Sequence, residues 1–218
     1  MKETMKRNRK FLIIASLIIL APMVVGMLLW NRLPDTLPTH FTFSGEADQW
    51  SSKAFAVFFL PLFLLVIQFA CLFGMSADPR RANISDRMLH LALLICPAVS
   101  LFAGILIYGN ALSLNVDAGL LGRLFAALLF LVIGNYLPKC RQNYTMGIKL
   151  PWTLHDVENW NRTHRMAGRL WVVLSIIVLI DAFFQRLSGA MLLGMLLLAV
   201  LAPTLYSYLY FVRHHQDR

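Results

Sequence analysis

Charged side chains are scarce in this sequence of 218 residues. Only 14% of the residues are aspartate, glutamate, lysine or arginine, whereas a soluble domain averages about 25%. Hydrophobic residues make up 58% of the chain, and the mean hydropathy is +0.64. Because so few charges leave little polar surface to face water, the composition excludes an ordinary soluble domain and indicates an integral membrane protein.

Polar breaks are also few, so the apolar residues form runs near the ~20 residues that a helix needs to cross a bilayer. The N-terminal run follows a basic start, as in a signal peptide, but it is too long and lacks a small-residue cleavage site, so we expect it to be retained. We predict an all-α integral membrane fold, with six transmembrane helices in a single domain, residues 1–218. The predicted spans are Phe11–Trp30, Ala54–Met75, Leu89–Asn110, Gly119–Pro138, Met166–Phe184 and Ala190–Val212.

Acidic residues are outnumbered by basic ones, 11 to 20, and the basic residues are unevenly placed. With the N-terminus inside, only four lysines and arginines fall on the outer side: Arg32, Lys53, Arg123 and Arg186. Positive residues favour the cytoplasmic side of a membrane. We therefore predict that both termini are cytoplasmic, that 31–53 is an extracytoplasmic loop and that 139–165 is a cytoplasmic loop. Topology thereby explains the net charge of +9, and no direct nucleic-acid binding is expected.

Cysteines and the sequence signatures of enzymes are scarce too. Cys71, Cys96 and Cys140 all fall toward the inner side in this topology, so no disulfide is expected. The chain has no nucleophile elbow, no phosphate-binding loop and no His-Glu-x-x-His helix. We expect neither a cofactor nor enzyme activity, with a metal-dependent membrane enzyme kept as an alternative.

Polar residues inside the predicted spans are few enough to consider singly. Arg123 and Asp181 lie near the outer ends of their spans, where an ionisable side chain needs a partner, a cavity or the interface. Gln68 lies near the middle of the second span, where an interhelical hydrogen bond would satisfy it. Four spans contain a proline, which indicates either ordinary kinks of the bundle or a cavity between broken helices: Pro22, Pro61, Pro97 and Pro203.

The outer segment Asn31–Lys53 is compact and polar. Pro34 and Pro38 stiffen it, and Gly45 permits a turn, so we expect an ordered loop. Three interpretations stay open: a structural scaffold, a recognition surface for an extracellular ligand, and a metal site. The metal interpretation depends on imidazole and carboxylate ligands that suit zinc, namely Asp35, His40, Glu46 and Asp48.

The inner segment Lys139–Arg165 has helix signals. Leu150 precedes Pro151, which favours extended backbone, and we predict a helix start at Thr153 with Asp156 in the first turn. The apolar spacing that follows predicts an amphipathic helix in the inner interface before the fifth span. Trp152, Trp160 and Trp171 are expected at headgroup level. Five basic residues are expected to face anionic lipid or an acidic partner: Lys139, Arg141, Lys149, Arg162 and Arg165.

Both long loops carry a family resemblance. The inner run "NYTMGIKLPWTL" followed by "VENWNRTHRMAG" resembles the SdpI-type bacterial immunity membrane proteins. The outer run "LPDTLPTHFTFSGEADQWSSK" is similar to the extracytoplasmic domain of unknown function that often precedes it. The family more often has Gly-Ile-Arg-Thr-Pro-Trp where this chain has "GIKLPW", so Lys149 keeps the charge without the bidentate fork of arginine.

The resemblance implies a multi-pass protein of the bacterial cytoplasmic membrane that protects the cell against a secreted peptide toxin. It also implies signalling, in which a cytoplasmic repressor is drawn to the membrane. The outer recognition residues that it suggests are His40, Gly45, Glu46, Asp48, Trp50 and Lys53. The inner motif residues are Asn143, Gly147, Lys149, Pro151, Trp152, Thr153, Trp160, Thr163, His164, Arg165 and Gly168.

Two other classes of function stay open. A transporter or exporter of a peptide or small molecule would use the kinked helices as a path. A membrane-embedded enzyme would act on the headgroups of lipids or cell-wall precursors at one of the two loops. The expected partners are membrane lipids in every case, with a peptide toxin and a repressor added under the immunity interpretation.

Overall fold

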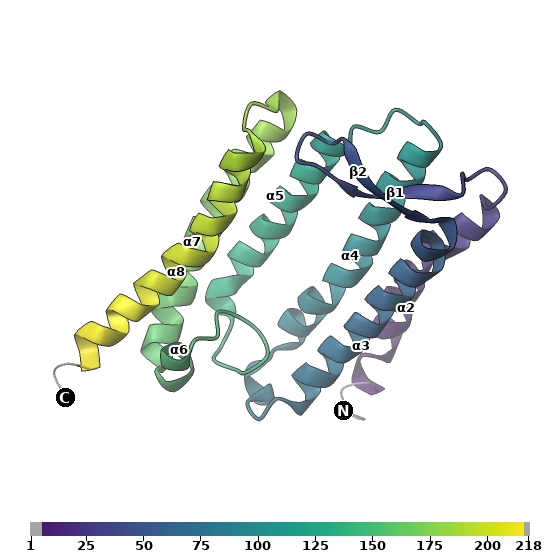
Figure 1. The fold of residues 1–218 in the computed structure, drawn as a ribbon. Coiled ribbons are helices and arrows are strands. Elements are labelled where there is room, and N and C mark those ends of the chain that lie inside the picture. Colours follow the sequence, from purple (N-terminus) through teal and green to yellow (C-terminus); the bar gives the residue numbers. More distant parts are fainter. Residues whose placement is uncertain (1–5, 216–218) are drawn as a thin grey trace. The chain divides into compact units, whose positions relative to one another are not determined.

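The computed structural model describes residues 6–215 of the chain. Within this part, six helices are long and apolar enough to cross a membrane, as predicted. Many of their outward side chains are apolar: Leu17 is 63% exposed and Leu28 81%, which suits lipid because only water disfavours apolar surface. The six are Arg9–Leu28 (α2), Phe55–Ala77 (a π-helical turn, Phe55–Phe59, then α3, Leu60–Ala77), Asp86–Ala111 (α4), Ala118–Lys139 (α5, Ala118–Tyr136, then a 3-10 turn), Val157–Phe184 (α7) and Gly189–His215 (α8) (Figure 1).

The remaining elements are short. Two strands, Thr36–Phe41 (β1) and Ala47–Ser52 (β2), separate α2 from α3, and a five-residue helix, Pro151–His155 (α6), precedes α7. The chain divides into two compact units. The first contains α2, the strands, α3 and α4; the second contains residues 78–85 together with α5 to α8.

Helices α2 and α4 of the first unit pack closely at a proline. A Cβ added to Gly104 would lie 2.9 Å from the Cβ of Pro22, so glycine permits the approach. Two hydroxyls reach across to α2: Ser100 Oγ donates to the carbonyl of Ile19 at 2.7 Å, and Tyr108 donates to the carbonyl of Pro22 at 2.9 Å. These two bonds tie α4 to the backbone of α2 around its proline. The cavity beside them measures about 20 Å³, room for about one water molecule.

Helices α5 and α7 of the second unit also approach through glycine. A Cβ added to Gly168 would lie 2.7 Å from the carbonyl oxygen of Gly134 and 2.7 Å from Pro138 Cγ. Gly168, a residue of the predicted inner motif, is therefore required by packing. Helices α7 and α8 are joined by a buried amide: Asn159 donates to the carbonyl of Ser207 at 3.0 Å and accepts its hydroxyl at 2.8 Å. The motif residue Thr163 donates to the same Asn159 oxygen at 3.0 Å.

Arg123 and Asp181, the two ionisable residues that the sequence places near the ends of spans, pair with each other inside the second unit. Arg123 of α5 contacts Asp181 of α7 at 3.0 Å, with the two side chains only 7% and 6% exposed. The other Asp181 oxygen accepts the backbone N–H groups of Arg186 and Leu187 at 2.8 and 2.9 Å, which holds the turn before α8. Of the alternatives that the sequence left open for Arg123 and Asp181, the structure therefore shows a partner: each has the other.

Two local predictions are wrong. Gln68 is buried, but neither polar atom of its side chain has a hydrogen-bond partner within the described residues, so the predicted interhelical bond is absent there. Helix α6 begins at Pro151, not at Thr153, because proline is favoured in the first turn of a helix. Asp156 then interrupts the helix with extended backbone and caps α7, which runs unbroken through the predicted fifth span. The expected interfacial helix and this span are therefore one helix from Val157 onward.

Candidate functional site

The outer segment, predicted as an ordered loop, is a β-hairpin (Thr36–Ser52; "the hairpin" below). Its strands lie across one end of the helices of the first unit (Figure 1). Leu33 and Leu37, 4% and 0% exposed, pack in a core with Val57 and Tyr108. A two-stranded hairpin alone is marginal in water, so this apolar contact fixes the hairpin on the helices.

The turn of the hairpin requires its glycine. Gly45 has φ of 90°, a left-handed conformation that costs other residues free energy. Its N–H donates to the carbonyl of Thr42 at 2.9 Å, and the N–H of Thr42 donates to the carbonyl of Glu46 at 2.8 Å. Gly45 therefore shapes the turn, and the side chain of Glu46 stays exposed.

Lys53 at the end of β2 points inward. Its ammonium donates to the carbonyls of Trp30 and Leu33 at 3.3 and 3.0 Å, lies 3.4 Å from Asp35, and sits 4.9 Å from the Trp30 ring centre. The side chain is 15% exposed. Free carbonyls at a helix C-terminus attract a cation, so Lys53 ties β2 to the end of α2. It holds the hairpin in place and offers little to a ligand.

The other predicted outer residues are accessible. His40 Nδ1 and Asp48 Oδ1 lie 2.6 Å apart across the strands, with side chains 58% and 42% exposed. Trp50 is 58% exposed and Phe43 at the turn 55%. Folding the hairpin leaves these side chains in contact with the surroundings, where they can meet a ligand.

The four candidate metal ligands do not converge. Asp35 lies against Lys53, while His40 and Asp48 pair with each other. Glu46 stands at the turn. Among residues 6–215 no group of three histidine, cysteine, aspartate or glutamate side chains could hold a metal ion.

The loop after α5 is organised by Asn143. Its Oδ1 accepts the N–H groups of Thr145 and Met146 at 2.9 and 2.7 Å, and its Nδ2 donates to the carbonyl of Arg141 at 2.8 Å. The side chain is 1% exposed. Asparagine favours such local turns because its short amide reaches the backbone two or three residues away.

Gly147, Trp160 and His164 form the centre of this loop. Gly147 has φ of 99°, and a Cβ there would lie 2.4 Å from His164 Nε2. His164 stacks on Trp160 with ring centres 4.1 Å apart; its Nε2 accepts the N–H of Ile148 at 2.9 Å, and its Nδ1 lies 2.8 Å from the carbonyl of Trp160. The two ring nitrogens therefore need a neutral imidazole with the proton on Nδ1. Trp160 Nε1 donates to the carbonyl of Cys140 at 2.7 Å.

Thr153 joins this loop to α6. Its hydroxyl accepts the N–H of Leu150 at 2.9 Å and lies 2.9 Å from the carbonyls of Ile148 and Leu150. The backbone carbonyl of Thr153 accepts Gln142 Nε2 at 2.7 Å. Both Thr153 and Gln142 are buried. We call the buried set Asp78, Gln142, Asn143, Thr153, Trp160 and His164 the polar cluster.

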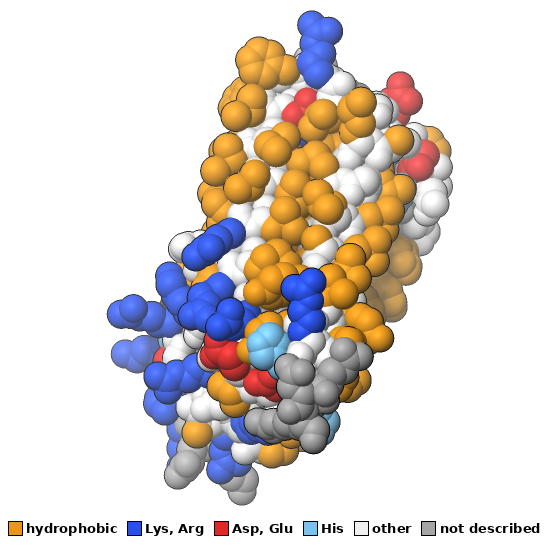
Figure 2. Space-filling view, turned by 90° about the vertical axis from the view of Figure 1, so that its left-hand side faces the viewer, with side chains coloured by type: hydrophobic (Ala, Val, Ile, Leu, Met, Phe, Trp, Pro, Cys, Tyr) orange, Lys and Arg blue, Asp and Glu red, His pale blue; other side chains and the backbone are white. Residues whose placement is uncertain are grey.

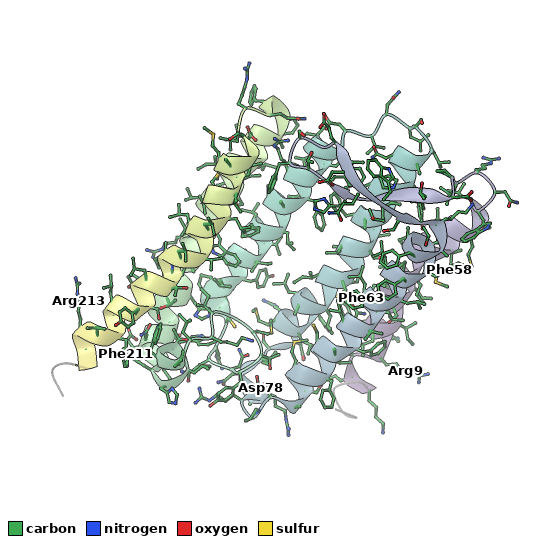
Figure 3. All side chains as sticks on the ribbon, in the orientation of Figure 1. Arg9, Phe58, Phe63, Asp78, Phe211 and Arg213 are labelled. Atoms are coloured by element: carbon green, nitrogen blue, oxygen red, sulfur yellow. The ribbon has the colours of Figure 1, made fainter. Side chains whose placement is uncertain are left out.

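Asp78 and Arg80, on the connector after α3, complete the polar cluster and were missed in the sequence. Asp78 lies just after α3 (Figure 3). It accepts the hydroxyl of Thr145 at 2.5 Å and the N–H of Tyr144 at 2.9 Å, while Arg80 donates to Gln142. Burial alone raises the pKa of the Asp78 carboxyl, but the bonds from Thr145, Arg80 and Tyr144 outweigh it and hold the pKa below its usual value. In the sequence this connector resembles a short solvated loop between two helices. The one pattern in it that could have indicated a structural role is the run Asp-Pro-Arg at the end of a helix.

The three cysteines are free, as predicted. Burial raises the pKa of the Cys140 thiol, with a hydrogen bond from Asn143 acting in the opposite direction. Cys140 therefore remains a neutral thiol and its neighbours Lys139 and Arg141 do not activate it.

The tryptophans of this region have different roles. Trp160 is 0% exposed, so the prediction that it anchors at headgroup level is wrong. It fills the centre of the loop, because Gly147 leaves space for its ring. Trp152 instead lies on the rings of Tyr208 and Phe211 of α8, at 5.4 and 6.1 Å between centres.

The exposed charged residues of the region are mostly basic. Figure 2 shows apolar side chains along α7 and α8, and lysine and arginine side chains gathered at the end where α7 begins and α8 ends. Arg165 lies 3.9 Å from Glu158, and Lys149 donates to the carbonyl of Thr145 at 2.9 Å. Pro151 is exposed as well, at the first position of α6. The exposed basic residues here are Lys139, Arg141, Lys149, Arg162, Arg165, Arg169 and Arg213.

Both of these regions match known families. Residues 139–207 match the SdpI/YfhL protein family, a range that includes most of the polar cluster and α7. Residues 17–65 match a domain of unknown function, DUF1648, a range that includes the whole hairpin. No solved structure matches the chain.

One curated relative is similar over the whole chain. It is the protein named "Immunity protein SdpI" of Bacillus subtilis (strain 168), 26% identical over 220 residues, which are 98% of this chain and 100% of the relative. The matches fall on the two loops that carried the resemblance in the sequence, in the same order, within six helices of membrane length. The chain is a multi-pass bacterial membrane protein whose residues 139–207 match the SdpI/YfhL protein family.

Proposed function

We propose that this protein protects a bacterium against a secreted antimicrobial peptide, and that the hairpin is the outer surface that meets the peptide. The family relationship supports immunity as the class of function, since the relative is an immunity protein. The charge bias of the sequence supports an outer position for the hairpin.

One observation supports the hairpin as the binding surface: when it folds, side chains that can bind a ligand stay exposed. His40, Asp48, Trp50 and Phe43 are all exposed at one end of the first unit. Aromatic residues flanked by polar ones are typical of recognition surfaces. An exposed tryptophan and phenylalanine in a short polar hairpin therefore favour binding over a pure scaffold role.

The second part of the proposal concerns the loop after α5. Its buried motif residues hold the loop in one shape, so a partner would contact the exposed basic residues around it, such as Arg141, Lys149 and Arg165. That surface suits anionic lipid headgroups and an acidic face of a cytoplasmic repressor. Relay of the peptide signal to such a repressor is the extension of the immunity function that we propose.

The test is expression of the chain in a peptide-sensitive bacterium, followed by challenge with a panel of secreted antimicrobial peptides. Protection against one peptide, in energised and de-energised cells alike, supports immunity by binding. Protection that disappears when the gradient is collapsed would instead favour an exporter. If no peptide of the panel is resisted at verified membrane levels, the proposal is rejected for that panel and its chemistry.

A further inference from the structure

The two edges of the hairpin differ in what they can bind. The N–H of Lys53 donates to the carbonyl of Asp35 at 2.8 Å. Bonded and non-bonded pairs alternate along an antiparallel ladder, so Thr36 opposite Ser52 and Pro38 opposite Trp50 are non-bonded pairs. Their backbone groups therefore point away from the partner strand. Trp50 directs its N–H and carbonyl outward from β2, and Ser52 directs its N–H outward, while its hydroxyl and carbonyl face the helical turn that begins at Lys53.

The β1 edge is blocked. Pro38 has no N–H to offer there, and proline at a non-bonded position costs the ladder nothing while preventing further pairing. Strand β1 also packs against α4, with Leu37 buried beneath it. The β2 edge has neither protection, because Asp48, Gln49, Trp50 and Ser52 are all exposed. Strand addition is therefore possible on β2 alone.

The charge along β2 selects among peptides. Glu46 and Asp48 are exposed on or beside the strand, whereas Lys53 is turned inward onto backbone carbonyls. An incoming strand meets carboxylates and an exposed indole, Trp50. Opposite charges on neighbouring strands stabilise pairing, and like charges oppose it.

We propose that the β2 edge binds an extended cationic segment of a peptide as a third strand of the hairpin. Main-chain hydrogen bonds to Trp50 and Ser52 provide affinity, and the carboxylates of Glu46 and Asp48 provide selectivity. The biological role of this site rests on the proposed immunity function, of which it is the binding mode. The binding itself is a property of the hairpin and is measurable without any toxin.

The probe is a heptapeptide of alternating lysine and valine, titrated onto the full chain in nanodiscs of neutral lipid. Its counterpart with every backbone nitrogen methylated has the same charge but cannot pair as a strand. The account predicts saturable binding of the first peptide and at least about tenfold weaker binding of the second. Equal binding of the two peptides, or equal binding to empty nanodiscs, overturns strand addition.

Three variants of the chain locate the site. Ser52→Pro removes an outward N–H without removing a bond between β1 and β2, and we expect about tenfold weaker binding. Ser52→Ala controls for the lost hydroxyl, which accepts the N–H of Phe55 at 3.3 Å. Thr36→Pro makes the same change on the opposite edge. Both controls are expected to bind the peptide within about twofold of the parent.

The other possible results of these experiments each reject either the β2 edge as the binding site or the immunity function. If Ser52→Pro binds as tightly as Thr36→Pro, the β2 edge is not the site. If the parent chain is a dimer without peptide and Ser52→Pro is a monomer, the edge pairs with a second copy and the proposal is wrong. Peptide binding without protection of cells would reject the immunity function and leave this site in place. Protection that survives Ser52→Pro would reject the site and leave immunity in place.

Discussion

The hairpin and the polar cluster are both polar segments next to membrane-length helices, and they are stabilised differently. The hairpin buries Leu33 and Leu37 and turns its polar side chains outward. The polar cluster buries an asparagine, a threonine and a histidine, each with its hydrogen bonds satisfied within a few ångströms. A buried polar network with all its bonds made specifies a single arrangement, whereas an apolar contact constrains the outward face very little.

This difference separates structural residues from residues available to a partner. In the inner motif, Asn143, Gly147, Thr153 and His164 are occupied by the fold itself. In the outer set, Gly45 shapes the turn, Lys53 is held by backbone carbonyls and His40 contacts Asp48 across the strands, whereas Glu46 and Trp50 are exposed. A family resemblance in the inner loop therefore reports mainly on architecture, and recognition depends on exposed side chains that the architecture leaves free.

The largest expected effect is all-or-none: the labelling of introduced cysteines on one side of the membrane and not on the other. A cysteine at Ser44, exposed at the tip of the hairpin, should react with a membrane-impermeant thiol reagent in intact cells. A cysteine at Asn161, exposed near the start of α7, should react only after permeabilisation. The parent chain provides the background from its three free cysteines. The reverse pattern would place the hairpin inside and remove its role in meeting a secreted peptide.

Gly147→Ala adds one methyl group next to the polar cluster, and we expect it to destabilise the protein more than a methyl group added at any other position there. The left-handed backbone and the 2.4 Å approach to His164 Nε2 together predict a loss of about 3 kcal/mol in the free energy of unfolding. Gly194→Ala is the matched control, because nothing lies within 4 Å of its added Cβ; a change within about 1 kcal/mol is expected. Thermal unfolding in detergent measures both. Equal midpoints for the two variants would mean that the loop is not tightly specified.

Asp78→Asn should weaken the polar cluster and alter its response to acid. Losing the charge on bonds from Thr145 and Tyr144 predicts a cost of about 1–3 kcal/mol at neutral pH. Because folding lowers the pKa of Asp78, its stabilisation is fully present above the usual value of 3.8 and is lost as pH falls through the lower folded value. Unfolding midpoints of the parent should therefore fall below about pH 4, and those of Asp78→Asn should fall less. Glu46→Gln, at an exposed acid of the hairpin turn, is the control.

Lys53→Met should loosen the hairpin by a smaller amount. The variant keeps the length of the side chain but loses two bonds to carbonyls at the end of α2, which predicts a cost of about 1–2 kcal/mol. Hydrogen exchange of the β2 amides measures the local effect. Arg32→Met is the control, since Arg32 is exposed. If both variants exchange like the parent, the inward lysine does not hold the hairpin.

The helices of this protein could be predicted from the sequence, and the two loops only in part. Six apolar runs near bilayer length leave little choice of fold, whereas for Arg123 and Asp181 the sequence left a partner, a cavity and the interface open and did not pair the two. The strands could not be predicted, because side-chain burial does not alternate along either of them and the burial of Leu37 depends on residues of α4. The burial of Trp160 could not be predicted from the sequence either, because the space that its ring fills is left by Gly147, thirteen positions away in the chain.

Long-range bonds explain the remaining misses. Asp78 and Arg80 reach residues of the loop after α5 more than 60 positions away, at Thr145 and Gln142. No local pattern announces such contacts, since a connector of this length is usually solvated. The inward turn of Lys53 is of the same kind: a lysine next to a strand is most often exposed, and only the free carbonyls of α2 attract it.

The most direct test of the central claim uses the exposed face of the hairpin. The double variant Asp48→Asn/Trp50→Ala removes an exposed carboxylate, which contacts His40 across the strands, and an exposed indole, and Leu114→Ala removes an exposed side chain elsewhere in the first unit. Protection of cells against the peptide that the parent resists is measured at matched membrane levels, together with unfolding midpoints. We predict that the double variant unfolds within about 0.5 kcal/mol of the parent and loses protection, while Leu114→Ala keeps it. Protection by the double variant equal to that of the parent would contradict the assignment of recognition to the hairpin.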